Sequence, residues 1–193
     1  MILLQGRLLA LIYLTLFGAW LFGELVLTVK RRAKTGLAAR DRGFAGQALL
    51  VVLLTNVAAI VCVRVFRGAT FATAITCYIG LVLMSAGLLL RWWAVVHLGR
   101  FFTVNVAVAA DQRVIDSGPY RWIRHPSYSG LLLLALGIGM CFGNVASILV
   151  ILIPIIALML KRMRIEEEAL ANGLGNAYRA YMDRTKRLIP GIY

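Results

Sequence analysis

The sequence predicts an all-α integral membrane protein with five transmembrane helices and a short cytoplasmic C-terminal helix. Hydrophobic residues make up 61% of its 193 positions and the mean hydropathy is +0.84, whereas soluble domains are about 45–50% apolar. The apolar residues gather in five runs near the length of about 20 residues that crosses a bilayer. Because we find no internal repeat and no linker between these runs, we expect a single membrane domain over residues 1–193.

The first three apolar runs form the N-terminal part of this domain, residues 1–97. Each is long enough to cross a bilayer, and segments with basic residues separate them. The three expected spans cover residues 8–29, 44–65 and 71–96. The first run is too long, and too poor in basic residues before it, for a cleavable signal peptide.

The second part, residues 98–193, combines a polar loop, two further spans and a charged tail. The spans are expected at 126–142 and 145–160, with only two residues, Gly143 and Asn144, between them. So short a connection predicts a tight antiparallel hairpin. The tail begins at Lys161, and its expected helix runs from about Arg164 to Arg184.

Basic residues predict the orientation of the chain in the membrane. Seventeen of the 21 Lys and Arg residues lie in the loop after the first span, the loop after the third span and the tail, which share one side of a five-span protein. Positive charge marks the cytoplasmic side, so we expect the N-terminus outside and the C-terminus in the cytoplasm. The same distribution explains the net charge of +13 by topology and anionic lipid contact, and argues against a nucleic-acid partner.

The segment "GPYRWIRHPSYSG", residues 118–130, has a composition that a plain loop does not need. Gly118 and Pro119 predict a turn, and Pro126 suits the first turn of the fourth span while keeping His125 out of helical geometry. The unpaired N–H groups at such a helix start favour an anionic group. Taken singly, the arginines and aromatic residues are also typical of membrane interfaces.

The tail places a second polar cluster on the same side. Glu166, Glu167 and Glu168 follow the fifth span, and Arg162 lies one helical turn before Glu166. The cluster is consistent with a solvated, salt-bridged helix. It is also consistent with a site in which the carboxylates hold a cationic ligand or orient Arg162 toward an anionic one.

Together these segments resemble the isoprenylcysteine carboxyl methyltransferase family. The loop motif is followed by "EExxL" (Glu166, Glu167 and Leu170), "LGNAYRAY" and "RLIP", and the resemblance covers residues 98–190. The related phospholipid N-methyltransferases share the loop motif. The resemblance implies an S-adenosyl-L-methionine-dependent membrane carboxyl methyltransferase without a Rossmann domain, and the chain indeed has no GxGxxG after a strand.

The resemblance also implies roles for particular residues. Arg162 and Glu166 correspond to the catalytic, substrate-binding pair, and Asn105 lies near the cofactor. Arg121, Arg124 or the N–H groups of the fourth span are alternative partners for the cofactor's carboxylate. The expected cofactor-binding residues are Gln112, Arg113, Val114, Ile115, Tyr120, His125, Pro126, Ser127 and Tyr128.

The expected partners are the lipid bilayer and a lipophilic acceptor, with an isoprenylcysteine-like carboxylate as first choice. An alternative acceptor is a phospholipid amine. The alternative functions are a sterol-type reductase that uses NADPH and a small transporter. A transporter would place polar groups near the membrane midplane, and the spans hold few of them. No metal is expected, because the three cysteines lie in apolar runs without ligand spacing.

Three polar residues lie within the expected spans and leave their roles open. Glu24 is interpreted as reaching the interface from its span, and Arg91 is equally consistent with an interfacial anchor and a functional site. Asn56 is expected to form a hydrogen bond with a neighbouring helix.

Overall fold

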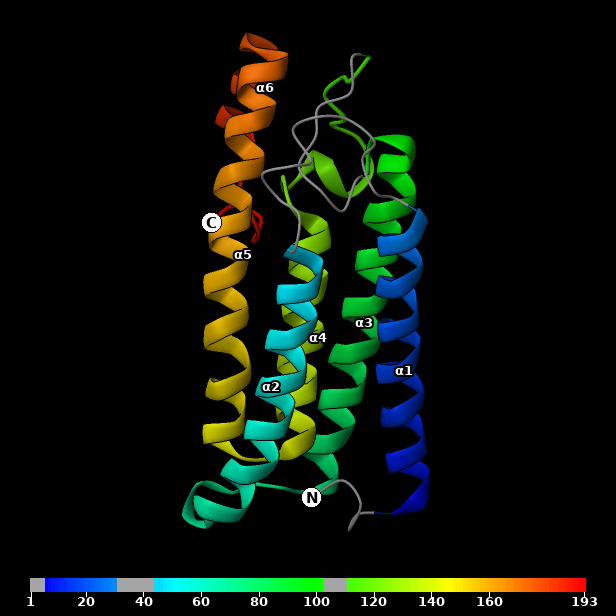
Figure 1. Ribbon diagram of the computed structural model, residues 1–193, viewed down its shortest axis with the longest axis vertical. Coiled ribbons are helices and arrows are strands. Elements are labelled where there is room, and N and C mark those ends of the chain that lie inside the picture. The colour runs from blue at the N-terminus through cyan, green and yellow to red at the C-terminus, as the bar shows by residue number, and fades with distance from the viewer. Residues whose placement is uncertain (1–5, 31–43, 103–110) are drawn as a thin grey trace.

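The computed structural model describes residues 6–30, 44–102 and 111–193, and these residues are mainly helical. Five long helices run side by side, and a sixth, short helix extends beyond one end (Figure 1). The predicted all-α class is confirmed. The elements are α1 (Arg7–Lys30), α2 (Phe44–Val65), η3 (Arg67–Ala69), α3 (Ala74–Leu98), η4 (Gly99–Phe101), η5 (Gly118–Arg121), α4 (Pro126–Phe142), α5 (Val145–Leu174) and α6 (Asn176–Arg184).

The five predicted spans correspond to five apolar helices. Four of them, α1, α2, α3 and α5, are long and apolar enough to cross a membrane, and α4 is shorter at 17 residues. Large apolar side chains cover their outward faces, with Phe22 and Ile153 among the exposed ones. Such a surface is unsuited to water and suited to lipid. The chain is therefore a multi-pass integral membrane protein.

Two helix boundaries differ from the sequence-based expectation. The third helix begins at Ala74, because Thr73 accepts a hydrogen bond from the backbone N–H of Thr76 and caps it. The fifth helix does not end at Leu160 but continues without a break to Leu174, since its charged residues are good helix formers. Gly175, with φ of +60°, then separates α5 from α6.

Glycines allow α3 and α4 to pack backbone against backbone. A Cβ atom at Gly87 would lie 2.5 Å from the carbonyl oxygen of Gly130, and one at Gly137 would lie 2.5 Å from that of Gly80. Gly80 and Gly87 are seven positions apart on α3, and Gly130 and Gly137 are seven positions apart on α4, so each pair lies on one face of its helix. Small residues at such positions permit close helix approach in membranes, and this contact positions the start of α4.

The α4–α5 hairpin closes the other end of the bundle, as predicted from its two-residue connection. Gly143 adopts the left-handed conformation with φ of 62°, and the side chain of Asn144 accepts a hydrogen bond from the N–H of Ser147. The Asn144 amide also donates to the carbonyl oxygen of Phe66 at 2.8 Å. The hairpin is thereby tied to the end of α2.

The C-terminal segment returns from α6 to the loop motif. The backbone N–H of Arg124 donates to the carbonyl oxygen of Lys186 at 2.7 Å, and that of His125 donates to Arg187 at 3.0 Å. The Ser129 hydroxyl donates to the carbonyl oxygen of Leu188. These bonds hold the bend before α4 against the tail.

Candidate functional site

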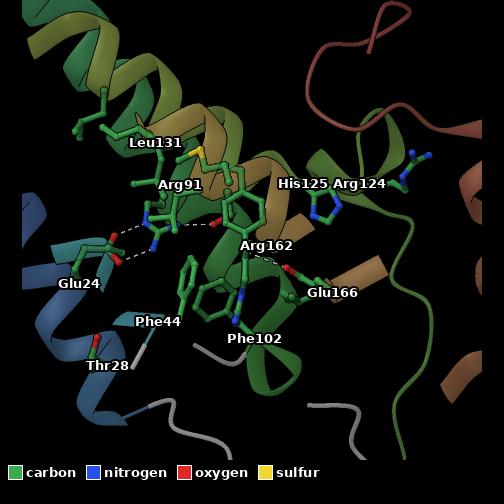
Figure 2. A pocket seen from close by; sticks show the side chains of 18 of the residues that line it. Glu24, Thr28, Phe44, Arg91, Phe102, Arg124, His125, Leu131, Arg162 and Glu166 are labelled. Carbon is green, nitrogen blue, oxygen red and sulfur yellow. Dashed lines mark hydrogen bonds and ion pairs between the residues drawn. The ribbon is translucent and has the colours of Figure 1, made fainter. Parts of the chain in front are cut away.

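One cavity of about 580 Å³ lies between the loop motif and helices α1, α2, α4 and α5. Residues of α3 also line it, and Figure 2 shows charged side chains of α1, α3, α5 and the loop motif around it. Of the eleven predicted site residues, only Pro126 is absent from its walls, because its ring is packed into the start of α4. The ten that line it are Gln112, Arg113, Val114, Ile115, Tyr120, His125, Ser127, Tyr128, Arg162 and Glu166.

His125 occupies the bend that the sequence predicts before Pro126. Its backbone has φ of −124° and ψ of 56°, and Pro126 begins α4 directly after it. The buried ring lies 5.5 Å from the ring of Tyr128, and its Nε2 atom lies 3.2 Å from Oε1 of Glu167. The bend therefore presents an imidazole whose orientation a buried carboxylate fixes.

Glu167 joins three segments that are distant in the sequence. Its carboxylate accepts hydrogen bonds from Arg124 Nε at 2.9 Å and Arg187 Nη2 at 2.7 Å, in addition to its contact with His125. The hydrogen bond with Glu167, and then the one with Tyr193, raise the pKa of Arg187. The second glutamate of "EExxL" thus holds the loop, α5 and the tail together.

The two arginines considered for the cofactor's carboxylate face elsewhere. Arg124 also donates to the carbonyl oxygens of Met182 and Thr185, at 2.7 and 2.5 Å, and its guanidinium points away from the centre of the cavity (Figure 2). Arg121 is exposed and is not among the lining residues. Arg124 still borders the cavity, but its guanidinium is already bonded to Glu167 and those two carbonyl oxygens, and Arg121 lies outside the walls.

Tyrosines form part of the polar wall. The buried Tyr120 hydroxyl donates to the carbonyl oxygen of Ala94 at 3.3 Å, and burial, followed by the charge of Glu166, raises its pKa. The hydroxyl of Tyr128 donates to Oε2 of Glu166 at 2.9 Å. The Tyr120 phenol therefore stays neutral at physiological pH. Both phenols act as hydrogen-bond donors with aromatic faces.

Arg162 and Glu166 lie one turn apart on the cavity face of α5, as their spacing predicts. The Arg162 side chain is buried, with its guanidinium carbon 4.4 Å from the centre of the Phe44 ring. A guanidinium over an aromatic face is attracted to it. Phe44 is the first residue of α2, so α2 and α5 together hold the cation at this level of the cavity.

Glu24 and Arg91 form a polar contact that the sequence-based interpretation missed. Glu24 does not simply reach the interface: its carboxylate pairs with Nε and, at 2.6 Å, with Nη2 of Arg91, and it accepts a bond from Trp20 Nε1. Arg91 is buried and donates from Nη1 to the Ser127 hydroxyl at 2.6 Å. It is therefore no interfacial anchor. Opposite charges at the same depth of two spans were the signal for this pairing.

Other polar residues also differ from expectation or extend it. Asn56 donates to the carbonyl oxygen of Val52 in its own helix, not to another helix, and it lines the cavity. His97 lies 2.9 Å from the Ser117 hydroxyl and beside the ring of Tyr120. Asn105 lies outside the described residues.

The apolar half of the cavity also went unpredicted. It is lined by side chains from α1, α2, α4 and α5, including Leu21, Val52, Leu131 and Ile155. No motif marks such residues, because an apolar side chain that faces a cavity and one that faces lipid look alike in a sequence. Within the described residues, no group of three or more His, Cys, Asp or Glu side chains is arranged to hold a metal ion.

The chain is similar to methyltransferases over part of its length. Residues 78–172 match the model of the isoprenylcysteine carboxyl methyltransferase (ICMT) family. A probable protein-S-isoprenylcysteine O-methyltransferase of Oryza sativa subsp. indica is 32% identical over 117 residues, which are 60% of this chain and 61% of the relative. The protein-S-isoprenylcysteine O-methyltransferase of Schizosaccharomyces pombe is also 32% identical, over 56% of this chain and 47% of the relative.

The fold is similar to a solved structure as well. The eukaryotic intramembrane Ras methyltransferase ICMT superposes with a TM-score of 0.65 and 26% sequence identity, over 76% of this chain and 53% of that one. The chain thus spans about half to three fifths of the length of these proteins.

Proposed function

Because residues 78–172 match the model of the isoprenylcysteine carboxyl methyltransferase family, we propose that this chain is a member of that family and a membrane methyltransferase. It transfers a methyl group from S-adenosyl-L-methionine to a carboxylate on a lipophilic acceptor. The named relatives support an isoprenylcysteine-type acceptor. The observation that carries the proposal is a cavity that joins the polar wall of the loop motif to an apolar wall inside the bundle.

The polar wall fits S-adenosyl-L-methionine in its mixture of groups. The cofactor supplies a methyl group on a positively charged sulfur, next to an adenine ring and an amino-acid end. Tyr120, His125 and Tyr128 offer aromatic faces to a flat base and to a cation. Gln112 and Arg113 add an amide and a positive charge on the same wall. We assign these residues, with Val114, Ile115, Pro126 and Ser127, to cofactor binding and support.

Arg162 and Glu166 act on the acceptor in this proposal. A buried guanidinium attracts a carboxylate and can bind it through two parallel hydrogen bonds. The Phe44 ring holds Arg162, and Tyr128 holds Glu166. A carboxylate acceptor is already ionised near neutral pH, so no side chain has to remove a proton from it. The catalytic contribution of the chain is orientation of the two partners and exclusion of water.

We also propose that the cavity faces the cytoplasm, with the N-terminus outside. The end of α1, the start of α2, the loop motif and α6 lie at one end of the bundle (Figure 1). Seventeen of the 21 basic residues belong to this end or to the loops that leave it. Labelling of single cysteines introduced at Arg67 and Lys186 in right-side-out vesicles tests this: only the former should react with an impermeant reagent.

The first experiment measures binding to the purified, full-length protein. Titration with S-adenosylhomocysteine and with NADPH should give heat only for the former, and binding of NADPH alone would overturn the proposal in favour of a reductase. His125→Ala and Tyr128→Phe should weaken S-adenosylhomocysteine binding. Arg162→Ala should leave it unchanged, because Arg162 belongs to the acceptor side.

The second experiment identifies the acceptor. The protein is incubated with methyl-labelled S-adenosyl-L-methionine and either N-acetyl-S-farnesylcysteine or phosphatidylethanolamine vesicles. Alkaline hydrolysis releases volatile methanol from a methyl ester but not from an N-methylated amine. We expect base-labile product from the thioether alone, and Arg162→Ala should abolish it, whereas the exposed neighbour Lys161→Ala should not. Label in the phospholipid only, or full turnover by Arg162→Ala, would refute the acceptor assignment.

A further inference from the structure

We propose that three side chains at the bottom of the cavity, Asn56 of α2, Ile138 of α4 and Ile151 of α5, limit the length of the acceptor chain. They are called the floor residues below. This inference rests on the proposed function, because it names the lipid that the same cavity takes. It concerns the apolar wall alone, to which no motif of the loop or the tail contributes.

The residues of α5 that line the cavity mark where it ends, because no described residue before Ile151 in this helix belongs to its wall. Arg162 and Met159 line its upper part, and Ile155, one turn deeper, is 9% exposed. Ile151, a further turn down, is 0% exposed although it borders the cavity. On α4 the lining residues run down to Ile138, and on α2 they run down to Asn56, with none of the described residues of these helices lining it beyond either position. The open space therefore closes at the level of the floor residues.

Direct helix contact seals the bundle below this level. The Ser147 hydroxyl of α5 donates to the carbonyl oxygen of Ala59 in α2 at 2.8 Å, and both residues are fully buried. A side-chain-to-backbone bond of this kind leaves no room for a chain between the two helices. Ser147 and Ala59 lie one turn beyond Ile151 and Asn56, so a lipid in the cavity meets packed protein there.

The helical rise gives the depth available to the acceptor. Arg162 and Ile151 are eleven positions apart on α5, which corresponds to about 16 Å at about 1.5 Å per residue. A carboxylate held at Arg162 places a cysteine sulfur about 4 Å below it, at about 1.2 Å per bond of an extended chain. About 12 Å then remain for the lipid.

This length separates the common prenyl chains. At about 1.2 Å per bond, a geranyl chain extends about 10 Å, a farnesyl chain about 14 Å and a geranylgeranyl chain about 19 Å. A geranyl chain fits, a farnesyl chain fits with slight bending, and a geranylgeranyl chain is about 7 Å too long by the same estimate. The floor residues therefore select chains of up to three isoprene units.

The test compares N-acetylcysteine thioethers of the three chains as methyl acceptors, with kcat/KM as the measured quantity. The wild-type protein should use the geranyl and farnesyl compounds at least about tenfold better than the geranylgeranyl compound, the order of discrimination for an ill-fitting apolar group. Ile151→Ala should raise relative use of the geranylgeranyl compound about tenfold, and Ile151→Phe should lower use of farnesyl but spare geranyl.

Two further variants keep the result interpretable. Ile153→Ala alters the same residue type on the lipid-facing side of α5, where Ile153 is 61% exposed, and should preserve the wild-type preference. Loss of S-adenosylhomocysteine binding would show that Ile151→Phe does not fold. In that case Ile138→Ala tests the floor residues from α4 instead. Equal use of all three chains, or unchanged preferences in folded Ile151 and Ile138 variants, would overturn the length limit. Methylation of none of the three compounds by a protein that binds S-adenosylhomocysteine would instead contradict the proposed acceptor class.

Discussion

Replacing Gly87 with alanine tests whether the close approach of α3 and α4 holds the site together. The new Cβ atom would lie 2.5 Å from the carbonyl oxygen of Gly130 and 2.7 Å from the backbone nitrogen of Leu134. Neither atom belongs to a movable side chain, so the helices themselves must separate, by about 0.5–1 Å to restore ordinary contact. Overpacking of this kind costs about 1–3 kcal/mol, and we expect the upper end because backbone must move.

The movement should also reach the polar wall. A Cβ at Gly130, on the opposite side of the same contact, would lie 2.8 Å from the backbone nitrogen of Arg91. Arg91 holds both Glu24 and Ser127, so a displaced α3 disturbs the cavity walls. Gly87→Ala should therefore weaken S-adenosylhomocysteine binding as well as stability.

Thermal unfolding of the purified protein in detergent measures the first effect. A loss of about 2–3 kcal/mol corresponds to a fall in Tm of roughly 4–12 °C for a chain of this size. Gly18→Ala is the matched control, because a Cβ at Gly18 in α1 has no neighbour within 4 Å. Alanine is the better helix former there, by up to about 1 kcal/mol. A Tm for Gly87→Ala within a degree of that of Gly18→Ala would refute the reasoning.

Three further predictions concern the polar contacts around the cavity. Glu24→Gln leaves the buried Arg91 charge without its partner, so it should lower Tm more than the double variant Glu24→Gln/Arg91→Met does. The double-mutant cycle should give a coupling free energy of about 1–3 kcal/mol. Additive effects of the two substitutions would contradict the ion pair. Tyr128→Phe removes one buried hydroxyl and should lower stability by only about 1 kcal/mol, so a larger loss of ligand affinity measured by titration would report a role in binding. Arg187→Ala removes a cation from Glu167 and should speed proteolysis of the C-terminal segment, measured by mass spectrometry, with the exposed Arg179→Ala as control; equal cleavage rates would refute this role.

The sequence predicted the helices well because the membrane makes a simple demand on composition. Apolar runs of sufficient length, interrupted by basic loops, placed α1, α2 and α4 to within a residue. It predicted a break after Leu160 and a separate tail helix from about Arg164 to Arg184, whereas α5 continues to Leu174 and the break lies at Gly175. Hydropathy reports where lipid ends, and helix propensity, which charged residues also satisfy, decides where the helix ends.

The candidate site was predictable where it carries a motif. His125, Tyr128, Arg162 and Glu166 could be named from "RHPSY" and the glutamate cluster, and the structure gathers them around one cavity. The contribution of α1 could not be named in this way. Glu24 lies 67 residues before Arg91, and no local pattern pairs charges across such a distance.

The sequence by itself determined that this is a membrane protein of five apolar helices, with its polar chemistry in one loop and the start of one tail. Composition and short motifs carry that information, because it depends on neighbouring residues. Only the tertiary structure decided which charges neutralise each other, how the tail holds the loop motif, and where the cavity ends. Those features depend on contacts between helices, set by glycine packing of α3 on α4 and by the Ser147–Ala59 contact of α5 with α2. No residue's neighbours in the chain specify them.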